Sequence, residues 1–83
     1  MDTISVVKGL LAHTLQIERR VDAYTADSPL LGAIPELDSM AVVNLITAME
    51  EHYGFVVQDD EITAEAFATL GSLARFVDRK LRQ

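Results

Sequence analysis

Two polar residues stand where a loop gives way to an amphipathic helix, and they carry the chemistry that this sequence offers. Asp38 and Ser39 precede Met40, after which apolar residues recur at intervals of three and four, as on one face of an α-helix. An acidic side chain at a helix start accepts a hydrogen bond from an unpaired backbone N–H and faces the positive end of the helix dipole. Asp38 is therefore predicted to cap the helix, which leaves the Ser39 hydroxyl free. The apolar stripe behind it consists of Val42, Leu45, Ile46, Met49 and Tyr53.

The Ser39 hydroxyl has two interpretations. Serine is an ordinary capping residue, so a structural role at the helix start is one of them. The other is a site for a covalently attached phosphate, because the unpaired N–H groups and the dipole of a helix N-terminus stabilise an anion. These residues taken alone leave both interpretations open.

Catalysis by the chain itself is not expected. An enzyme needs a nucleophile with a base, a pair of tuned carboxylates or a metal constellation. The two histidines, His13 and His52, are predicted on different helices, and no sequence feature joins either of them to Ser39. A serine without a base is a poor nucleophile. The sequence therefore predicts a non-catalytic protein with no metal centre.

Length and composition indicate one small domain over residues 1–83 with a single core. The chain has no cysteine, so disulfides and thiolate metal sites are excluded, and any thiol chemistry must come from an attached group. Its apolar runs are too short to cross a bilayer, so no membrane insertion is expected. The first residues lack a basic region followed by an apolar block, which favours a cytosolic protein. We also expect a monomer.

The net charge of −6 is unevenly spread. Residues 21–74 contain no Lys or Arg, and only Asp2, Glu18 and Asp78 among the 13 acidic residues lie outside that span. An acidic middle of this kind repels nucleic acid and anionic membranes and attracts basic patches on partner proteins. Nucleic-acid binding is therefore excluded.

The hydrophobic spacing predicts an all-α, four-helix bundle with three longer helices and one short helix. The longer helices are expected over residues 3–16, over 39–53 with Gly54 as the C-cap, and from Gly71 or Ser72 to the basic end of the chain. The short helix is expected to begin at Thr63 and to turn Phe67 inward. A long loop joins the first and second helices over residues 17–37. Its predicted anchors to the core are Tyr24, Leu30, Leu31, Ile34 and Leu37.

Asp59, Asp60 and Glu61 form an acidic run with no Lys or Arg nearby in the sequence. The run is either a solvated loop or a weak site for a divalent cation, since it lacks the spaced ligands of a calcium loop. Mutual repulsion predicts that salt or divalent cations raise the melting temperature.

Over nearly its whole length the chain resembles an acyl carrier protein. The similarity lies in the long loop that enters Leu37-Asp38-Ser39-Met40, and in Val43, Leu45 and Ile46 of the following helix. It continues through residues 48–55, the acidic turn 59–62 and residues 67–73 before the last helix.

The resemblance implies that Ser39 is the attachment point of 4′-phosphopantetheine, transferred from coenzyme A by a phosphopantetheinyl transferase. Acyl groups would then be carried as thioesters between acyl-loading and acyl-processing enzymes with basic patches. By the same resemblance, Asp38 presents the serine to the transferase and Met40 packs beside the attached arm. The expected partner-binding residues are Glu36, Ala41, Asn44, Thr47, Glu50 and Glu51, of which Ala41, Asn44, Thr47 and Glu51 lie on the outward face of the helix, with Glu50 near one edge.

Carriers for fatty-acid synthesis usually have acidic residues two and five positions after the serine, where this chain has Ala41 and Asn44. The sequence therefore favours a carrier of a specialised pathway, in lipid, polyketide or related biosynthesis. The alternatives are an aminoacyl or peptidyl carrier with the same arm, and a helical interaction module with no arm.

Overall fold

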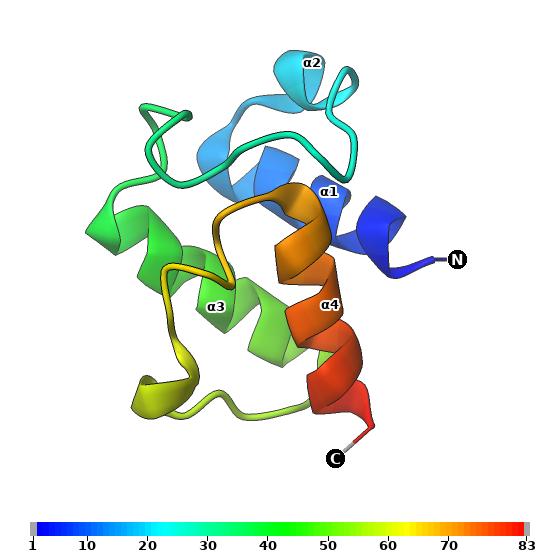
Figure 1. Ribbon diagram of the computed structural model, residues 1–83, viewed down its shortest axis with the longest axis vertical. Helices are drawn as coiled ribbons and strands as arrows, with labels where there is room; N and C mark the ends of the chain where they lie inside the picture. Colours follow the sequence, from blue (N-terminus) through cyan, green and yellow to red (C-terminus); the bar gives the residue numbers. More distant parts are fainter. Residues whose placement is uncertain (1, 83) are drawn as a thin grey trace.

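The computed structural model describes residues 2–82, which form four α-helices and one turn of 3₁₀-helix (Figure 1). The described residues contain no strand, and Pro29 and Thr69 form an isolated β-bridge. The predicted all-α class, with three longer helices and one short one, is confirmed. None of the described helices is long and apolar enough to span a membrane. The elements are α1 (Thr3–Leu15), α2 (Glu18–Val21), α3 (Ser39–Tyr53), η1 (Asp59–Glu61) and α4 (Leu70–Leu81).

Helix α1 is the centre of the bundle, because it lies against α2, α3 and α4. It begins where Asp2 accepts a hydrogen bond from the backbone N–H of Ser5 at 2.8 Å, and it ends at Gln16, which is left-handed with φ 58°. The apolar faces of the helices meet in one cluster of buried side chains. The most completely buried of these are Val7, Leu11, Leu30, Leu45, Met49, Leu70, Leu73 and Val77.

The short helix lies in a different place from the one predicted. It is α2, inside the loop between α1 and α3, where Ile17 and Val21 are buried four residues apart. At Thr63 the hydroxyl does accept from the backbone N–H of Ala66 at 3.2 Å, and Phe67 is buried as expected, but residues 64–67 form only a turn. The chain cannot continue as a helix there, because the next carbonyls accept hydrogen bonds from another segment.

That other segment is the long loop, which is joined to residues 67–71 by four backbone hydrogen bonds. We call these four hydrogen bonds the clasp. Leu30 and Leu31 donate to the carbonyls of residues 68 and 67 at 2.9 and 3.0 Å. Leu70 and Gly71 donate to those of residues 28 and 26 at 3.0 and 2.8 Å. A Cβ at position 71 would lie 2.8 Å from the Ala26 carbonyl oxygen, so this close approach requires glycine. In Figure 1 the loop crosses the top of the bundle and reaches the start of α3 at the left.

One predicted loop anchor is wrong. Leu30, Ile34 and Leu37 are buried and Tyr24 packs against the core, but Leu31 is 42% exposed. Successive side chains of an extended segment point to opposite sides, so burial of Leu30 turns its neighbour outward. Helix α4 starts at Leu70, one residue before the predicted range, because Thr69 caps it through the backbone N–H of Ser72 at 3.0 Å.

The sequence suggested that no basic side chain lies near the acidic run 59–61, but the structure places one beside it. Both carboxylate oxygens of Glu61 lie 2.9 Å from the Lys80 ammonium, whose side chain is only 8% exposed. Within residues 2–82 no three acidic or histidine side chains cluster as a metal site would require. The interpretation as a run of mutually repelling carboxylates is therefore wrong for Glu61, because this residue is paired with Lys80. The sequence did not show the pair, since the two residues are 19 positions apart.

The Glu61 ion pair should make stability depend on pH. The pKa of this carboxyl lies below its ordinary value of 4.5, because the Gln58 backbone N–H and the Lys80 ammonium both donate to it. A depressed pKa contributes stability that is present above the ordinary value and is lost as the pH falls through the folded-state pKa. We expect Glu61→Gln to lower the urea midpoint at neutral pH and to match the wild type in acid. Glu65→Gln, which removes an exposed carboxylate, should show no such convergence.

Candidate functional site

The start of α3 is held by Asp38. This residue has an extended backbone, with φ −97° and ψ −175°, and its Oδ1 accepts a hydrogen bond from the backbone N–H of Ala41 at 2.8 Å. Its carbonyl oxygen accepts from the backbone N–H of Val42 at 2.9 Å. Both contacts fix the first turn of the helix, so the prediction that Asp38 is the N-cap is confirmed.

Ser39 is the first residue of α3 and is exposed. Within residues 2–82 its hydroxyl has no hydrogen-bond partner, so capping is the role of Asp38 alone. The backbone N–H groups of Ser39 and Met40 also have no acceptor in this part of the chain. Two unpaired amides at the positive end of a helix suit a phosphate bonded to the serine. The residues present therefore fit a phosphate-linked group on this side chain.

The two residues before Asp38 are held in place, one by the core and the other by an ion pair. Leu37, directly before the cap, is buried in the core. Glu36 forms an ion pair with Arg20 of α2 at 2.6 Å, and this contact holds the pKa of the Glu36 carboxyl below its usual range. The pair is about half exposed, so its contribution to stability is small. It nevertheless ties α2 to the segment that presents Ser39.

The structure corrects one predicted partner-binding residue and shows an internal contact for another. Ala41 was expected on the outward face of α3, but it is only 9% exposed. It precedes the fully buried Leu45 by four residues, and residues four apart lie on the same side of a helix. Glu50 is half-buried, and its carboxylate accepts a hydrogen bond from the backbone N–H of Val57 at 2.8 Å. It therefore anchors the segment after α3.

Asn44, Thr47 and Glu51 are exposed as expected. The Thr47 hydroxyl donates to the backbone carbonyl of Val43 at 3.0 Å. Two apolar side chains share this face, because Met40 is 68% and Val43 is 56% exposed. Val43 was not among the predicted site residues, although the spacing could have identified it, since it lies three residues after Met40 and off the buried stripe. We call Met40, Val43, Asn44, Thr47 and Glu51 the outer face of α3.

The titratable rings of α3 lie far from Ser39. His52 is exposed at the opposite end of α3, about 20 Å away at 1.5 Å per residue. Its ring packs edge-on against Tyr53, at 4.9 Å between centroids. The Tyr53 hydroxyl is buried without a partner in the described structure, and burial, with Asp78 nearby, raises the pKa of this phenol. Both groups are too far from the serine to activate it.

Removal of the cap should weaken the helix that carries Ser39. We expect Asp38→Ala to lower the free energy of unfolding by about 1 kcal/mol, because the Ala41 backbone N–H then loses its acceptor. Asp38→Ser should recover most of this loss, because serine is also a good N-cap. Urea denaturation of the three proteins measures the effect. Equal stability of the alanine variant and the wild type would show that the cap is dispensable.

Comparison with known proteins places this geometry among related chains. Residues 5–77 match the family model described as the phosphopantetheine attachment site. The solution structure of a holo acyl carrier protein from Nitrosomonas europaea is 54% identical, covers 100% of both chains and superposes with a TM-score of 0.91. A second holo acyl carrier protein, from Geobacter metallireducens, is 26% identical, with a TM-score of 0.78 over 99% of this chain and 88% of the other.

Proposed function

The chain belongs to the acyl carrier protein family, and on that basis we propose that Ser39 is the residue to which its 4′-phosphopantetheine is attached. Proteins of this family are non-catalytic carriers of acyl groups, and they work with a phosphopantetheinyl transferase and acyl-handling enzymes. When bound, the group supplies a terminal thiol, which this chain lacks because it has no cysteine.

The observation that carries the proposal is the exposed Ser39 hydroxyl at a helix start whose cap is already provided by Asp38. Asp38 fixes the direction of the first turn, and we propose that it also presents the serine to the transferase. Phosphate attachment places negative charge beside the unpaired amides of Ser39 and Met40, where the helix dipole stabilises it. The test is to incubate apo protein with coenzyme A, Mg²⁺ and a broad-specificity transferase, and to map the modified peptide.

We propose that partner enzymes dock on the outer face of α3 beside the arm. Its exposed apolar side chains, Met40 and Val43, can contact an enzyme surface directly. Of the carboxylates proposed to bind partners, that of Glu51 makes no hydrogen bond or ion pair within residues 2–82. Those of Glu36 and Glu50 are already bonded, to Arg20 and to the backbone N–H of Val57. Ala41 is no longer proposed, because it is buried.

We further propose that the protein serves a specialised biosynthetic pathway. This rests on the exposed, neutral Asn44, which stands at a position that is usually acidic in carriers for fatty-acid synthesis. Mass spectrometry of the native thioester would identify the acyl group and thus the pathway. The cytosolic location, the monomeric state and the single domain stay predictions.

Partner choice can be tested at Asn44. Asn44→Glu should make a fatty-acid ketosynthase or malonyl transferase accept the holo protein several-fold faster at low salt, because an exposed pair is worth about 0.2 to 1 kcal/mol. The gain should shrink at high salt. Ser5→Glu is the control, because it adds the same charge at an exposed position of α1, outside the outer face of α3, and should leave the rate unchanged. Ala41→Glu is unsuitable, since it would bury a carboxylate. An unchanged rate for Asn44→Glu would remove the main support for the specialised pathway.

A further inference from the structure

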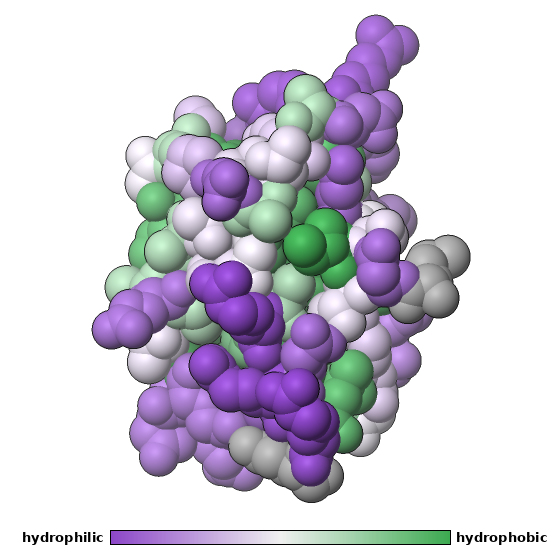
Figure 2. All heavy atoms as spheres, turned by 45° about the vertical axis from the view of Figure 1, so that its right-hand side comes forward, coloured by the Kyte–Doolittle hydropathy of each residue, from purple (hydrophilic) through white to green (hydrophobic). Residues whose placement is uncertain are grey.

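Helix α4 exposes a row of arginines on a strongly acidic protein. Arg75, Arg79 and Arg82 are spaced i, i+4 and i+7, so they share one side of the helix over about 10 Å, and all three are exposed. We call them the α4 arginine stripe. Figure 2 shows the most hydrophilic side chains of that view gathered in its lower middle, over the C-terminal part of α4.

The stripe has no partner within residues 2–82. None of its three guanidinium groups makes a hydrogen bond or ion pair there. Arg75 and Arg79 line a hollow of about 200 Å³ beside the turn that carries Thr63 and Glu65, and the Glu65 carboxylate does not come within 4 Å of either. Arg20 and Lys80 pair with Glu36 and Glu61, and Lys8 donates to the Asp22 carbonyl. Arg19 of α2 is also exposed and without such a partner within residues 2–82, but it stands alone rather than in a row.

Folding does not account for the stripe. A basic residue in the last turn complements the helix dipole, which explains Arg79. Arg75 lies in the middle of α4, where the helix dipole does not stabilise a positive charge. Like charges four residues apart repel each other and slightly destabilise a helix. A row of unpaired like charges that costs stability is the kind of local inconsistency that marks a functional surface.

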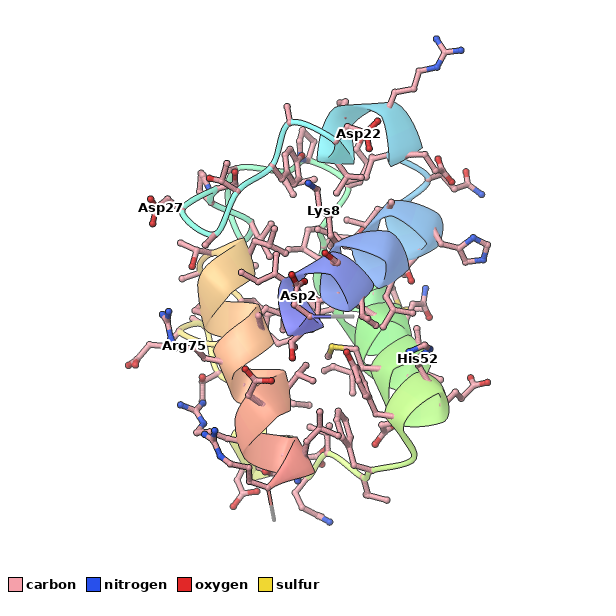
Figure 3. All side chains as sticks on the ribbon, turned by 90° about the vertical axis from the view of Figure 1, so that its right-hand side faces the viewer. Asp2, Lys8, Asp22, Asp27, His52 and Arg75 are labelled. Carbon is pink, nitrogen blue, oxygen red and sulfur yellow. The ribbon has the colours of Figure 1, made fainter. Side chains whose placement is uncertain are left out.

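The stripe is separate from the site at Ser39. In Figure 3 the Arg75 side chain projects from α4 away from the bundle, on the opposite side from α3 and its residue His52. A partner held on the stripe therefore leaves the outer face of α3 and the attached arm free for an enzyme.

We propose that the α4 arginine stripe is a second docking site, which binds an acidic segment of a partner protein. Guanidinium groups bind carboxylates through two parallel hydrogen bonds, and three of them in a row match a peptide with regularly spaced Asp or Glu side chains. Such a segment held on α4 would raise the effective concentration of the arm at the enzyme that carries the segment.

A short segment fits the charge distribution better than an extended anionic surface. The protein has a net charge of −6, so a membrane, a nucleic acid or a second copy of the chain is repelled by the acidic residues 21–74. At physiological salt these charges act over only about 8 Å. A peptide lying along the stripe meets the three arginines, and the carboxylates that share hollows with them, such as Glu65 and Asp78, limit where its own acidic side chains can bind.

The test uses the full-length holo protein and a fluorescein-labelled poly-glutamate peptide, with binding followed by fluorescence anisotropy. We expect binding at low salt that weakens as salt rises. The double variant Arg75→Gln/Arg79→Gln should bind at least about fivefold more weakly. A matched control, Lys8→Gln/Arg19→Gln, changes the net charge equally on α1 and α2 and should bind as the wild type does. Equal weakening by both variants, or no peptide binding at low salt, would overturn the proposal.

Two further measurements separate the other possible occupants. Sedimentation with vesicles of phosphatidylglycerol tests an anionic membrane, and sedimentation velocity at rising protein concentration tests a second copy. Stripe-dependent binding to either one without binding to the peptide would replace the acidic segment with that occupant. Both double variants should unfold in one cooperative transition and load at Ser39 as the wild type does, so that loss of peptide binding cannot be assigned to misfolding or to failure of the arm site.

Discussion

Replacing Ser39 with alanine should abolish covalent loading of phosphopantetheine and leave the fold intact. The side chain is exposed, its hydroxyl has no partner in residues 2–82, and the cap of α3 is made by Asp38. Ser39→Ala therefore removes the attachment oxygen without removing a structural contact. We expect complete loss of the mass increase after treatment with coenzyme A and a transferase. The free energy of unfolding should change by less than about 0.5 kcal/mol.

The other serines provide the controls for this experiment. Ser28 accepts a hydrogen bond from the Thr25 backbone N–H at 2.8 Å, and Ser72 donates to the Ala66 carbonyl at 3.0 Å, so both hydroxyls have structural roles. Ser5→Ala removes an exposed serine near the start of α1 and should load as the wild type does. Modification that persists in Ser39→Ala, at any of these positions, would refute the assignment of the arm. A large loss of stability in Ser39→Ala would instead show that the hydroxyl has a structural role.

Leu30→Ala should destabilise the protein by about 2 to 5 kcal/mol, the range typical of a leucine removed from a close-packed core. Leu30 is fully buried, although it lies in a loop, and its backbone N–H donates to the Ala68 carbonyl at 2.9 Å. The truncated side chain leaves a cavity between the loop and the start of α4, and the clasp limits how far the loop can collapse into it. The loss equals a large part of the total stability of a small domain.

Leu31→Ala is the matched control, because it removes the same atoms from the adjacent residue. Leu31 is 42% exposed, and its backbone hydrogen bond to the Phe67 carbonyl does not depend on its side chain. We expect it to change the free energy of unfolding by less than about 1 kcal/mol in urea denaturation. Equal losses for the two leucines would mean that the loop is not packed as described. The urea midpoint of Leu30→Ala also reports whether the loop folds together with the helices.

Local sequence determined the parts of the protein that depend on near neighbours in the chain. The period of apolar residues fixed α3 at Ser39–Tyr53, and short-range capping chemistry fixed its two ends at Asp38 and Gly54. The resemblance at Leu37-Asp38-Ser39-Met40 pointed to Ser39, because the motif is contiguous and its context is one helix start. These features need contacts across no more than four residues, and the sequence contains all of that information.

The tertiary structure decided what depends on segments far apart in the chain. Leu30 and Leu31 are chemically equal, and only the clasp to residues 67–71 selects which of them is buried. The same clasp ends the turn after Thr63 before it becomes a helix. Glu61 pairs with Lys80, which lies 19 residues later in the chain and has a largely buried side chain on α4. Ala41 was assigned to the wrong face because it is small and lies at the edge of the apolar stripe, so that its burial depends on how closely α3 packs against its neighbours.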